Sequence, residues 1–171
     1  MKSVIAVRPG HLEIRDTPVP KPGPYQALVR TECACLCNRT DSDLLHGTFP
    51  GMEDKFPFAL GHESVGTVVE VGEKVRQFAV GDRAVGGLNF DLQVEGMASG
   101  WGGFGEFTIA NDYAAMVADG VADEAHGWRE VYEIQTKVDA DIPAQEAVLL
   151  CTWREVLRHF VIFICSRVTM C

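Results

Sequence analysis

The sequence predicts a mainly β domain (α+β class), built as a sandwich or barrel with a few short helices. Short runs rich in valine, isoleucine and threonine recur at residues 2–7, 11–15, 27–32 and 65–71, and such β-branched runs favour strands. Glycine and proline, 17 and 8 in number, separate the runs, as is typical of sandwiches and barrels. Of the 171 residues, 47% are apolar, which is enough for one real hydrophobic core.

The first two predicted strands flank a turn at Arg8, Pro9 and Gly10. Residues 16–25 follow as a proline-rich connection, which can be neither a helix nor a central strand because proline lacks a backbone donor. Alternating apolar positions then indicate the strand at 27–32.

Three cysteines, Cys33, Cys35 and Cys37, alternate at the end of this strand and would share one face of it. One interpretation is a face of small core residues, because unpaired cysteine is usually buried. A second is a local thiolate cluster for a metal, although structural zinc sites favour wider spacing. A third gives Cys37 metal-ligating partners far along the chain.

The stretch 61–85 places His62 and Glu63 between Gly61 and Gly66, at the start of a valine-rich strand. The glycines allow backbone angles or close approaches that a Cβ would forbid. A His-Glu pair at the mouth of a buried β unit is a metal-type ligand pair. A Gly-Asp-Arg turn at 81–83 predicts a further strand.

The remaining segments carry weaker signals. The glycine-rich region 86–105 has no strand–loop–helix unit of the phosphate-binding kind, and it predicts a turn into a strand at 106–110. Residues 117–147 are acidic and predict a solvated face or loop. His46 is expected to be a surface or loop histidine.

A helix is predicted at the end of the chain, with Thr152 as its N-cap and Glu155 completing a capping box. Cys151 would then immediately precede a helix N-terminus, whose N–H groups favour a thiolate. Apolar side chains recur at helical spacing on one face of this helix, namely Trp153, Val156, Leu157, Phe160, Val161 and Ile164.

The net charge of −9 argues against nucleic acid or an anionic membrane as a partner. The short N-terminal apolar run is broken at Arg8, unlike a signal peptide, and no apolar stretch approaches the roughly 20 residues of a membrane span. We therefore expect a cytoplasmic protein whose six cysteines are thiols or metal ligands.

The arrangement of His62 and Glu63 with Gly61, Gly66 and Gly72 resembles the signature of zinc-containing alcohol and polyol dehydrogenases, in the medium-chain dehydrogenase/reductase superfamily. The segments CNRTD at 37–41 and GGFGEF at 102–107 also resemble that family. The resemblance implies a GroES-like, partly open β-barrel, with the zinc-binding catalytic domain at 1–151. Residues 152–171 would begin the helix that leads into a cofactor domain.

The resemblance also implies site roles. Cys37, His62 and Cys151 would hold one catalytic zinc ion and leave a fourth position open. Asp41 would orient His62, Thr40 would pass the substrate's proton, and Glu63 would approach the open position during ligand exchange. The chain has no cysteine between Cys37 and Cys151, so we expect no structural zinc.

The resemblance reaches about Val156 and covers only the first of the family's two domains. We therefore expect zinc binding without turnover for this chain, and NAD(P)-dependent oxidation of an alcohol or polyol only in a full-length form with a Rossmann domain. The main alternative is a non-enzymatic GroES-like module that associates through its exposed C-terminal helix. A zinc-free quinone-reductase-like domain is a third hypothesis, against which the three candidate ligands argue.

Overall fold

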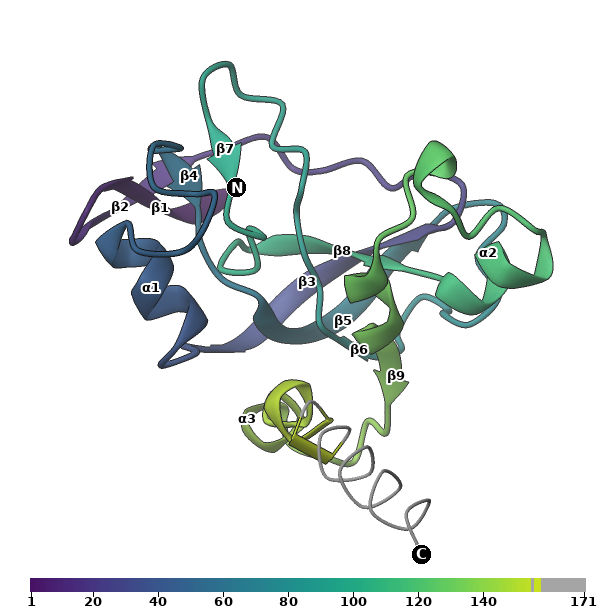
Figure 1. Ribbon diagram of the computed structural model, residues 1–171. Helices are drawn as coiled ribbons and strands as arrows, with labels where there is room; N and C mark the ends of the chain where they lie inside the picture. Colours follow the sequence, from purple (N-terminus) through teal and green to yellow (C-terminus); the bar gives the residue numbers. More distant parts are fainter. Residues whose placement is uncertain (155, 158–171) are drawn as a thin grey trace, which may run out of the picture.

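The computed structural model describes residues 1–154 and 156–157. The strands in these residues form two sheets (Figure 1). Within the described residues the sheets do not close into a barrel. The four-stranded sheet has the order β2 (His11–Asp16), β1 (Lys2–Arg8), β4 (Phe58–Ala59) and β7 (Ala98–Ser99). The five-stranded sheet has the order β8 (Phe107–Asn111), β3 (Gln26–Cys35), β5 (Glu63–Val71), β6 (Arg83–Val85) and β9 (Thr136–Val138).

The helices are short and lie around the sheets. The α-helices are α1 (Thr40–His46), α2 (Tyr113–Ala118) and α3 (Ala144–Ala147), and the 3-10 helices are η1 (Glu124–His126) and η2 (Glu130–Ile134). A further helical stretch begins at residue 150 and is described up to residue 157, without residue 155. In Figure 1, α1 and α2 lie at opposite ends of the molecule, and α3 lies beneath the five-stranded sheet, where it contacts β3 and β5.

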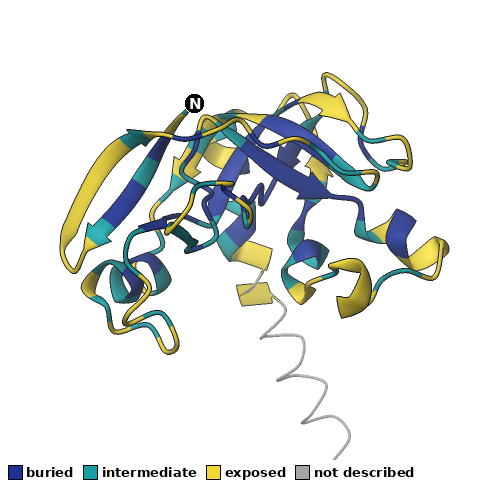
Figure 2. Cartoon of the chain, turned by 90° about the horizontal axis from the view of Figure 1, so that it is seen from above, coloured by how far each residue is buried: buried dark blue, intermediate teal, exposed yellow. Residues whose placement is uncertain are grey.

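The centre of the fold is the antiparallel pair β3 and β5, and Figure 2 shows buried strand segments in dark blue in the middle of the molecule. Val29 of β3 pairs with Val68 of β5, and both side chains are almost fully buried. They belong to a core cluster of small and β-branched residues with Phe78, which suits a face covered by closely packed strands. By contrast, β2 lies at a sheet edge and exposes Leu12 and Ile14.

Two glycines allow backbone approaches that fix this pair. A Cβ on Gly66 would overlap with the carbonyl oxygen of Arg30 on the neighbouring strand. Gly61 has a φ of 103°, which favours glycine, and a Cβ there would overlap with the ring of Phe104. The chain therefore packs closely against its neighbours just before His62, at Gly61, and just after Glu63, at Gly66.

The predicted mainly β fold with a few short helices is confirmed. The predicted strands correspond to β1, β2, β3, β5, β6 and β8. The prediction of a solvated face or loop over residues 117–147 is wrong in part, because this segment contains strand β9. It also contains Gln135, whose buried side chain donates to the carbonyl of Gly86 at 2.7 Å. The acidic side chains themselves are mostly exposed, as expected.

The predicted start of the last helix is also wrong. Its helical residues begin at 150, so Thr152 lies inside the helix and not at its N-cap. The other member of the predicted capping box, Glu155, lies outside the described residues, as do Phe160, Val161 and Ile164.

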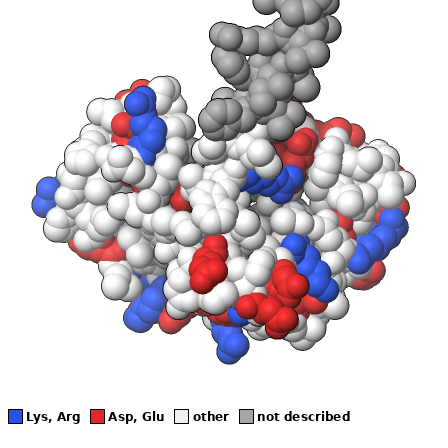
Figure 3. All heavy atoms as spheres, turned by 90° about the horizontal axis from the view of Figure 1, so that it is seen from below, with Lys and Arg blue, Asp and Glu red and all other residues white. Residues whose placement is uncertain are grey.

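Charged side chains of both signs lie close together on the face seen in Figure 3. Ion pairs join segments far apart in the sequence, for example Lys137 of β9 with Asp82 at 2.6 Å and Arg76 with Asp119 at 2.7 Å. None of the helices within the described range is long and apolar enough to cross a membrane.

Candidate metal centre

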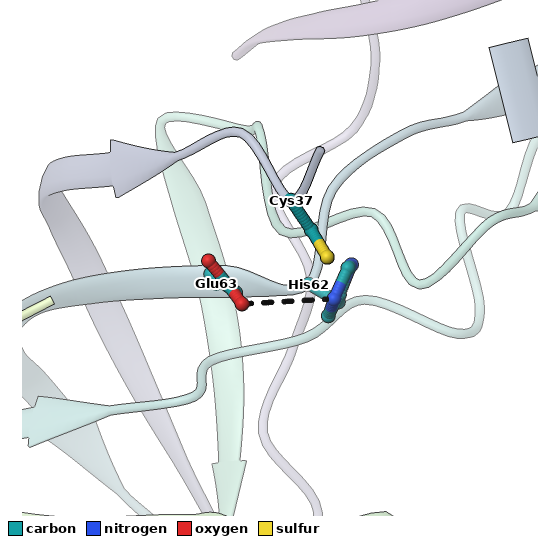
Figure 4. A group of neighbouring side chains, drawn as sticks. All are labelled: Cys37, His62 and Glu63. Atoms are coloured by element: carbon teal, nitrogen blue, oxygen red, sulfur yellow. Dashed lines mark ion pairs between the residues drawn. The ribbon is translucent and has the colours of Figure 1, made fainter. Parts of the chain in front are cut away.

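Three ligand-type side chains meet at the junction of β3 and β5. The Cys37 sulfur, a His62 ring nitrogen and a Glu63 carboxylate oxygen all lie within 4.8 Å of one another (Figure 4). Cys37 follows the end of β3, His62 immediately precedes β5, and Glu63 is the first residue of β5. Because Cys35 pairs with Glu63 across the antiparallel strands, the end of β3 necessarily lies beside the start of β5.

His62 is held by Asp41 of α1. The Asp41 Oδ1 atom lies 3.0 Å from His62 Nδ1, and the aspartate side chain is fully buried. The other ring nitrogen, Nε2, lies 4.0 Å from Glu63 Oε1. Burial disfavours the imidazolium, but the hydrogen bond and charge of Asp41, with the charges of Cys37 and Glu63, raise the pKa of His62 above its ordinary value.

The neighbours of Cys37 favour ionisation of its thiol. Burial opposes ionisation, yet hydrogen bonds from the backbone of Thr40 and Arg39, the Thr40 hydroxyl and the charge of His62 outweigh it. The pKa of Cys37 therefore lies below its ordinary value. The backbone N–H of Cys37 donates to Asp41 Oδ2 at 2.9 Å, so Asp41 contacts both Cys37 and His62.

Glu63 is only 4% exposed and has partners on two sides. Thr152 Oγ1 donates to Glu63 Oε1 at 2.7 Å from a point 89 residues later in the chain. Cys35 is the second partner. Burial raises the pKa of its thiol most, and the charge and hydrogen bond of Glu63 raise it further. Sequence reasoning missed Thr152 and Cys35 at this site, although the alternation of the cysteines indicates which face of β3 Cys35 occupies.

Cys151 lies next to this group and not within it. Its side chain is 5% exposed and packs in an apolar cluster with residues of β5, β6, β9 and α3. Its sulfur lies 3.9 Å from the carbonyl oxygen of Ser64. Cys33 and Cys35 pack against the same cluster. Of the three ligands predicted from the sequence, the structure brings Cys37 and His62 together and places Glu63 as the third neighbour.

Aromatic residues form the wall beside His62. The ring of Trp101 lies 5.6 Å from the imidazole ring and 5.4 Å from that of Phe49. The segment that follows Trp101 is tied to the strand entry, because Gly103 N donates to the carbonyl of Gly61 at 2.6 Å. Trp101 was not predicted from the sequence, and its position between glycines is the only signal for it.

Residues 100–105 have the spacing G-x-G-x-x-G. In dinucleotide-binding folds this spacing precedes a helix whose N-terminus receives the pyrophosphate. Here the segment leads into strand β8 instead, and its glycines pack against Phe58, Asn89 and Gly61. These glycines therefore serve close packing next to the metal centre.

The residues present fit a zinc ion. Thiolate, imidazole and carboxylate are the ligand types that zinc takes, and three protein ligands leave one position open. A hydrogen bond donated by His62 Nδ1 to the Asp41 carboxylate is the usual support of a metal-bound imidazole. The buried Glu63 carboxylate brings negative charge that a cation would balance.

Comparison with known proteins agrees with the fold. Residues 23–119 match the alcohol dehydrogenase GroES-like domain family. Over 86 residues the chain is 41% identical to an acryloyl-coenzyme A reductase of Sulfurisphaera tokodaii, covering 50% of this chain and 25% of that protein. It is 37% identical over 81 residues to a sorbitol dehydrogenase of Bos taurus, covering 47% of this chain and 23% of that protein.

Among solved structures, galactitol-1-phosphate dehydrogenase from Escherichia coli is similar in fold, with a TM-score of 0.59 and 19% identity. The similarity covers 87% of this chain and 41% of that one. The matched part is about a quarter of the length of these two curated relatives. The chain belongs to the alcohol dehydrogenase GroES-like domain family of the medium-chain dehydrogenase/reductase superfamily.

Proposed function

We propose that this chain is the zinc-binding catalytic domain of an NAD(P)-dependent alcohol or polyol dehydrogenase. The observation that carries the proposal is the meeting of Cys37, His62 and Glu63 within 4.8 Å, with Asp41 behind the imidazole. Membership of the dehydrogenase family and the likeness to sorbitol dehydrogenase support the same substrate class.

Cys37 and His62 would hold the ion, and Glu63 would complete the set in the arrangement seen here. Zinc bound at this site supplies a Lewis acid for the oxygen of an alcohol substrate. Asp41 keeps the Nδ1 atom of His62 occupied, so that Nε2 is the nitrogen directed to the ion. Thr40 is half-buried at the start of α1, next to Cys37, where its hydroxyl can receive the substrate's proton and pass it toward solvent.

Cys151 is the other candidate for the third position. Its sulfur lies against Ser64 in an apolar cluster, one residue away from the threonine that contacts Glu63. To serve as a ligand it would have to leave that cluster. We therefore place Glu63 ahead of Cys151 as the third ligand.

We further propose that this chain binds zinc without catalysing hydride transfer. Hydride transfer to a nicotinamide requires a dinucleotide site, which medium-chain dehydrogenases build in a second, Rossmann domain. In this chain the glycine-rich segment with the matching spacing leads into β8. The coenzyme would therefore belong to a full-length form of the protein.

Metal analysis of the purified chain tests the proposal. We expect about one zinc ion per chain, and loss of this ion when Cys37→Ala, His62→Ala and Cys151→Ala are combined. His46→Ala is the matched control, because His46 is exposed at the end of α1 and pairs with the carbonyl of Ser42. Absence of stoichiometric zinc, or zinc retained by the triple variant, would contradict the proposal.

A second candidate function is a non-enzymatic interaction module, which exposed apolar side chains on the last helix favour. Trp153 is 58% exposed and Leu157 64%, and Val156 lies beside them at 48%. Such a patch marks an association surface. Mixing the chain with a full-length homologue tests it: a stable complex that survives zinc removal and is lost on Trp153→Glu would favour the module over the metalloenzyme domain.

A further inference from the structure

We propose that Thr152 is a positioning residue of the metal centre, because its hydroxyl holds the Glu63 carboxylate in the ligand position. The proposal rests on the metal-binding function proposed above. It adds a residue from the last helix to a site that is otherwise built from α1 and from the ends of β3 and β5.

The geometry singles out one oxygen of Glu63. Thr152 Oγ1 donates to Oε1 at 2.7 Å, and this same Oε1 is the atom that lies 4.0 Å from His62 Nε2. The Asp41 contact occupies Nδ1 and so leaves Nε2 as the ligating nitrogen. The oxygen that Thr152 holds is therefore the oxygen that faces the metal position.

Burial makes this hydrogen bond significant. Glu63 is 4% exposed, and a buried carboxylate with few partners is costly. Its hydrogen-bond donors among the described residues include the Thr152 hydroxyl and the Cys35 thiol, of which the thiol is the weaker, and His62 Nε2 lies farther away at 4.0 Å. Removing the hydroxyl would leave Oε1 free to turn away from the metal position.

The helix register decides which side chain reaches Glu63. Consecutive residues on an α-helix point about 100° apart. Cys151 therefore packs against the apolar cluster by Ser64, while Thr152 points to Glu63. In this register the helix presents a hydroxyl to the site and keeps the thiol in the core, which favours a carboxylate as the third ligand.

The arrangement parallels the one around His62. Carboxylate ligands of metals are usually hydrogen-bonded by outer residues, whose loss weakens metal affinity about 10- to 100-fold. Asp41 plays this part for His62, and Thr152 plays it for Glu63. A purely structural contact would instead tie the helix to β5 and affect stability without affecting the metal.

The experiment compares the full chain with Thr152→Val, Thr152→Ala and Thr152→Ser by competition of zinc with a chromophoric chelator. Thr48→Val is the matched control, because Thr48 is an exposed threonine whose hydroxyl donates to Asp43. We expect the valine and alanine variants to bind zinc about 10-fold or more weakly. The serine and Thr48 variants should stay within about twofold of the native chain.

Thermal unfolding of the metal-free variants separates positioning from stability. A positioning role predicts that the zinc affinity of Thr152→Ala falls at temperatures where the metal-free variant is still fully folded, even though loss of the buried hydrogen bond lowers its melting temperature. Native affinity in both the valine and alanine variants, or a serine variant as weak as alanine, would overturn the proposal while zinc binding itself stands. Failure of the native chain to bind zinc would overturn the proposed function as well.

Discussion

The buried carboxylate of Asp41 contacts both Cys37 and His62, two of the candidate metal ligands. Its Oδ1 lies 3.0 Å from His62 Nδ1, and its Oδ2 accepts the backbone N–H of Cys37 at 2.9 Å. The side chain is fully buried. A single residue at the start of α1 therefore contacts both the backbone of Cys37 and the imidazole of His62.

Replacement of this carboxylate should weaken the site. In Asp41→Asn one oxygen becomes an amide nitrogen, so the contact to His62 or the contact to Cys37 loses its acceptor. We expect zinc affinity to fall about 10- to 100-fold, as for other partners of metal-bound histidines. Chelator competition measures this fall.

Asp43→Asn is the matched control for that substitution. Asp43 lies on the same helix and its side chain pairs with Arg39 at the surface. Its zinc affinity should equal that of the native chain. If Asp41→Asn also bound zinc with native affinity, His62 would need no carboxylate partner.

The identity of the third ligand can be decided with a pair of substitutions. Glu63→Gln keeps an oxygen for Thr152 but removes the charge that faces His62, so it should lower zinc affinity about 10-fold or more. Cys151→Ala should leave zinc affinity within about threefold, since its sulfur packs against Ser64. Chelator competition measures the zinc affinity of both variants. A large loss of affinity in Cys151→Ala, with native affinity in Glu63→Gln, would make Cys151 the third ligand.

Gly66→Ala should destabilise the fold, because the new Cβ would overlap with the carbonyl oxygen of Arg30 on β3. Overpacking of this kind costs about 1–3 kcal/mol of unfolding free energy. Urea unfolding measures the loss. Gly23→Ala is the control, since its Cβ would meet only the flexible side chain of Gln26. A stability of Gly66→Ala equal to that of the control would mean that β3 and β5 can separate without cost.

The ion pair of Asp82 and Lys137 should make stability depend on pH. The hydrogen bond from Lys137 lowers the pKa of Asp82 below its ordinary value of 3.8. Because the folded pKa is depressed, the stabilisation is fully present above that value and is lost as the pH falls through the folded pKa.

Asp82→Asn should therefore cost about 0.5–1 kcal/mol at neutral pH, as expected for a pair near the surface. The difference from the native chain should vanish once the pH lies below the folded pKa of Asp82. Urea unfolding across pH gives both values. Lys2→Gln is a useful comparison, because it removes a more exposed pair with Asp16 and should cost less. A pH-independent difference for Asp82→Asn would contradict the assignment to this ion pair.

The strands could be predicted from the sequence because their signals are repeated along several residues. Val65 and Val68 indicate β5, and glycines mark its close approach to β3. Helix α1 has seven residues, and its signals are confined to Asp41 and Asp43 in the first turn and Gly47 after the last. So short a segment shows no clear periodicity, and the sequence does not predict it.

Of the cluster formed by Cys37, His62 and Glu63, the sequence predicts the first two as metal ligands. Cys37 and His62 lie near the ends of strands whose pairing follows from the pattern of the chain. The third position depends on where the last helix begins, and helix ends are the least predictable part of a fold. A shift of one residue exchanges Cys151 for Thr152, because each step turns the side chain by about 100°.

The contact between Thr152 and Glu63 joins residues that the ribosome adds to the chain at widely separated times. Asp41 precedes His62 by 21 residues, so both leave the ribosome early and can meet early. Thr152 follows Glu63 by 89 residues. A nascent chain thus carries Cys37, Asp41 and His62 well before the hydroxyl that contacts Glu63. The group of Cys37, Asp41, His62 and Glu63 is therefore translated well before the residue that completes its hydrogen bonds.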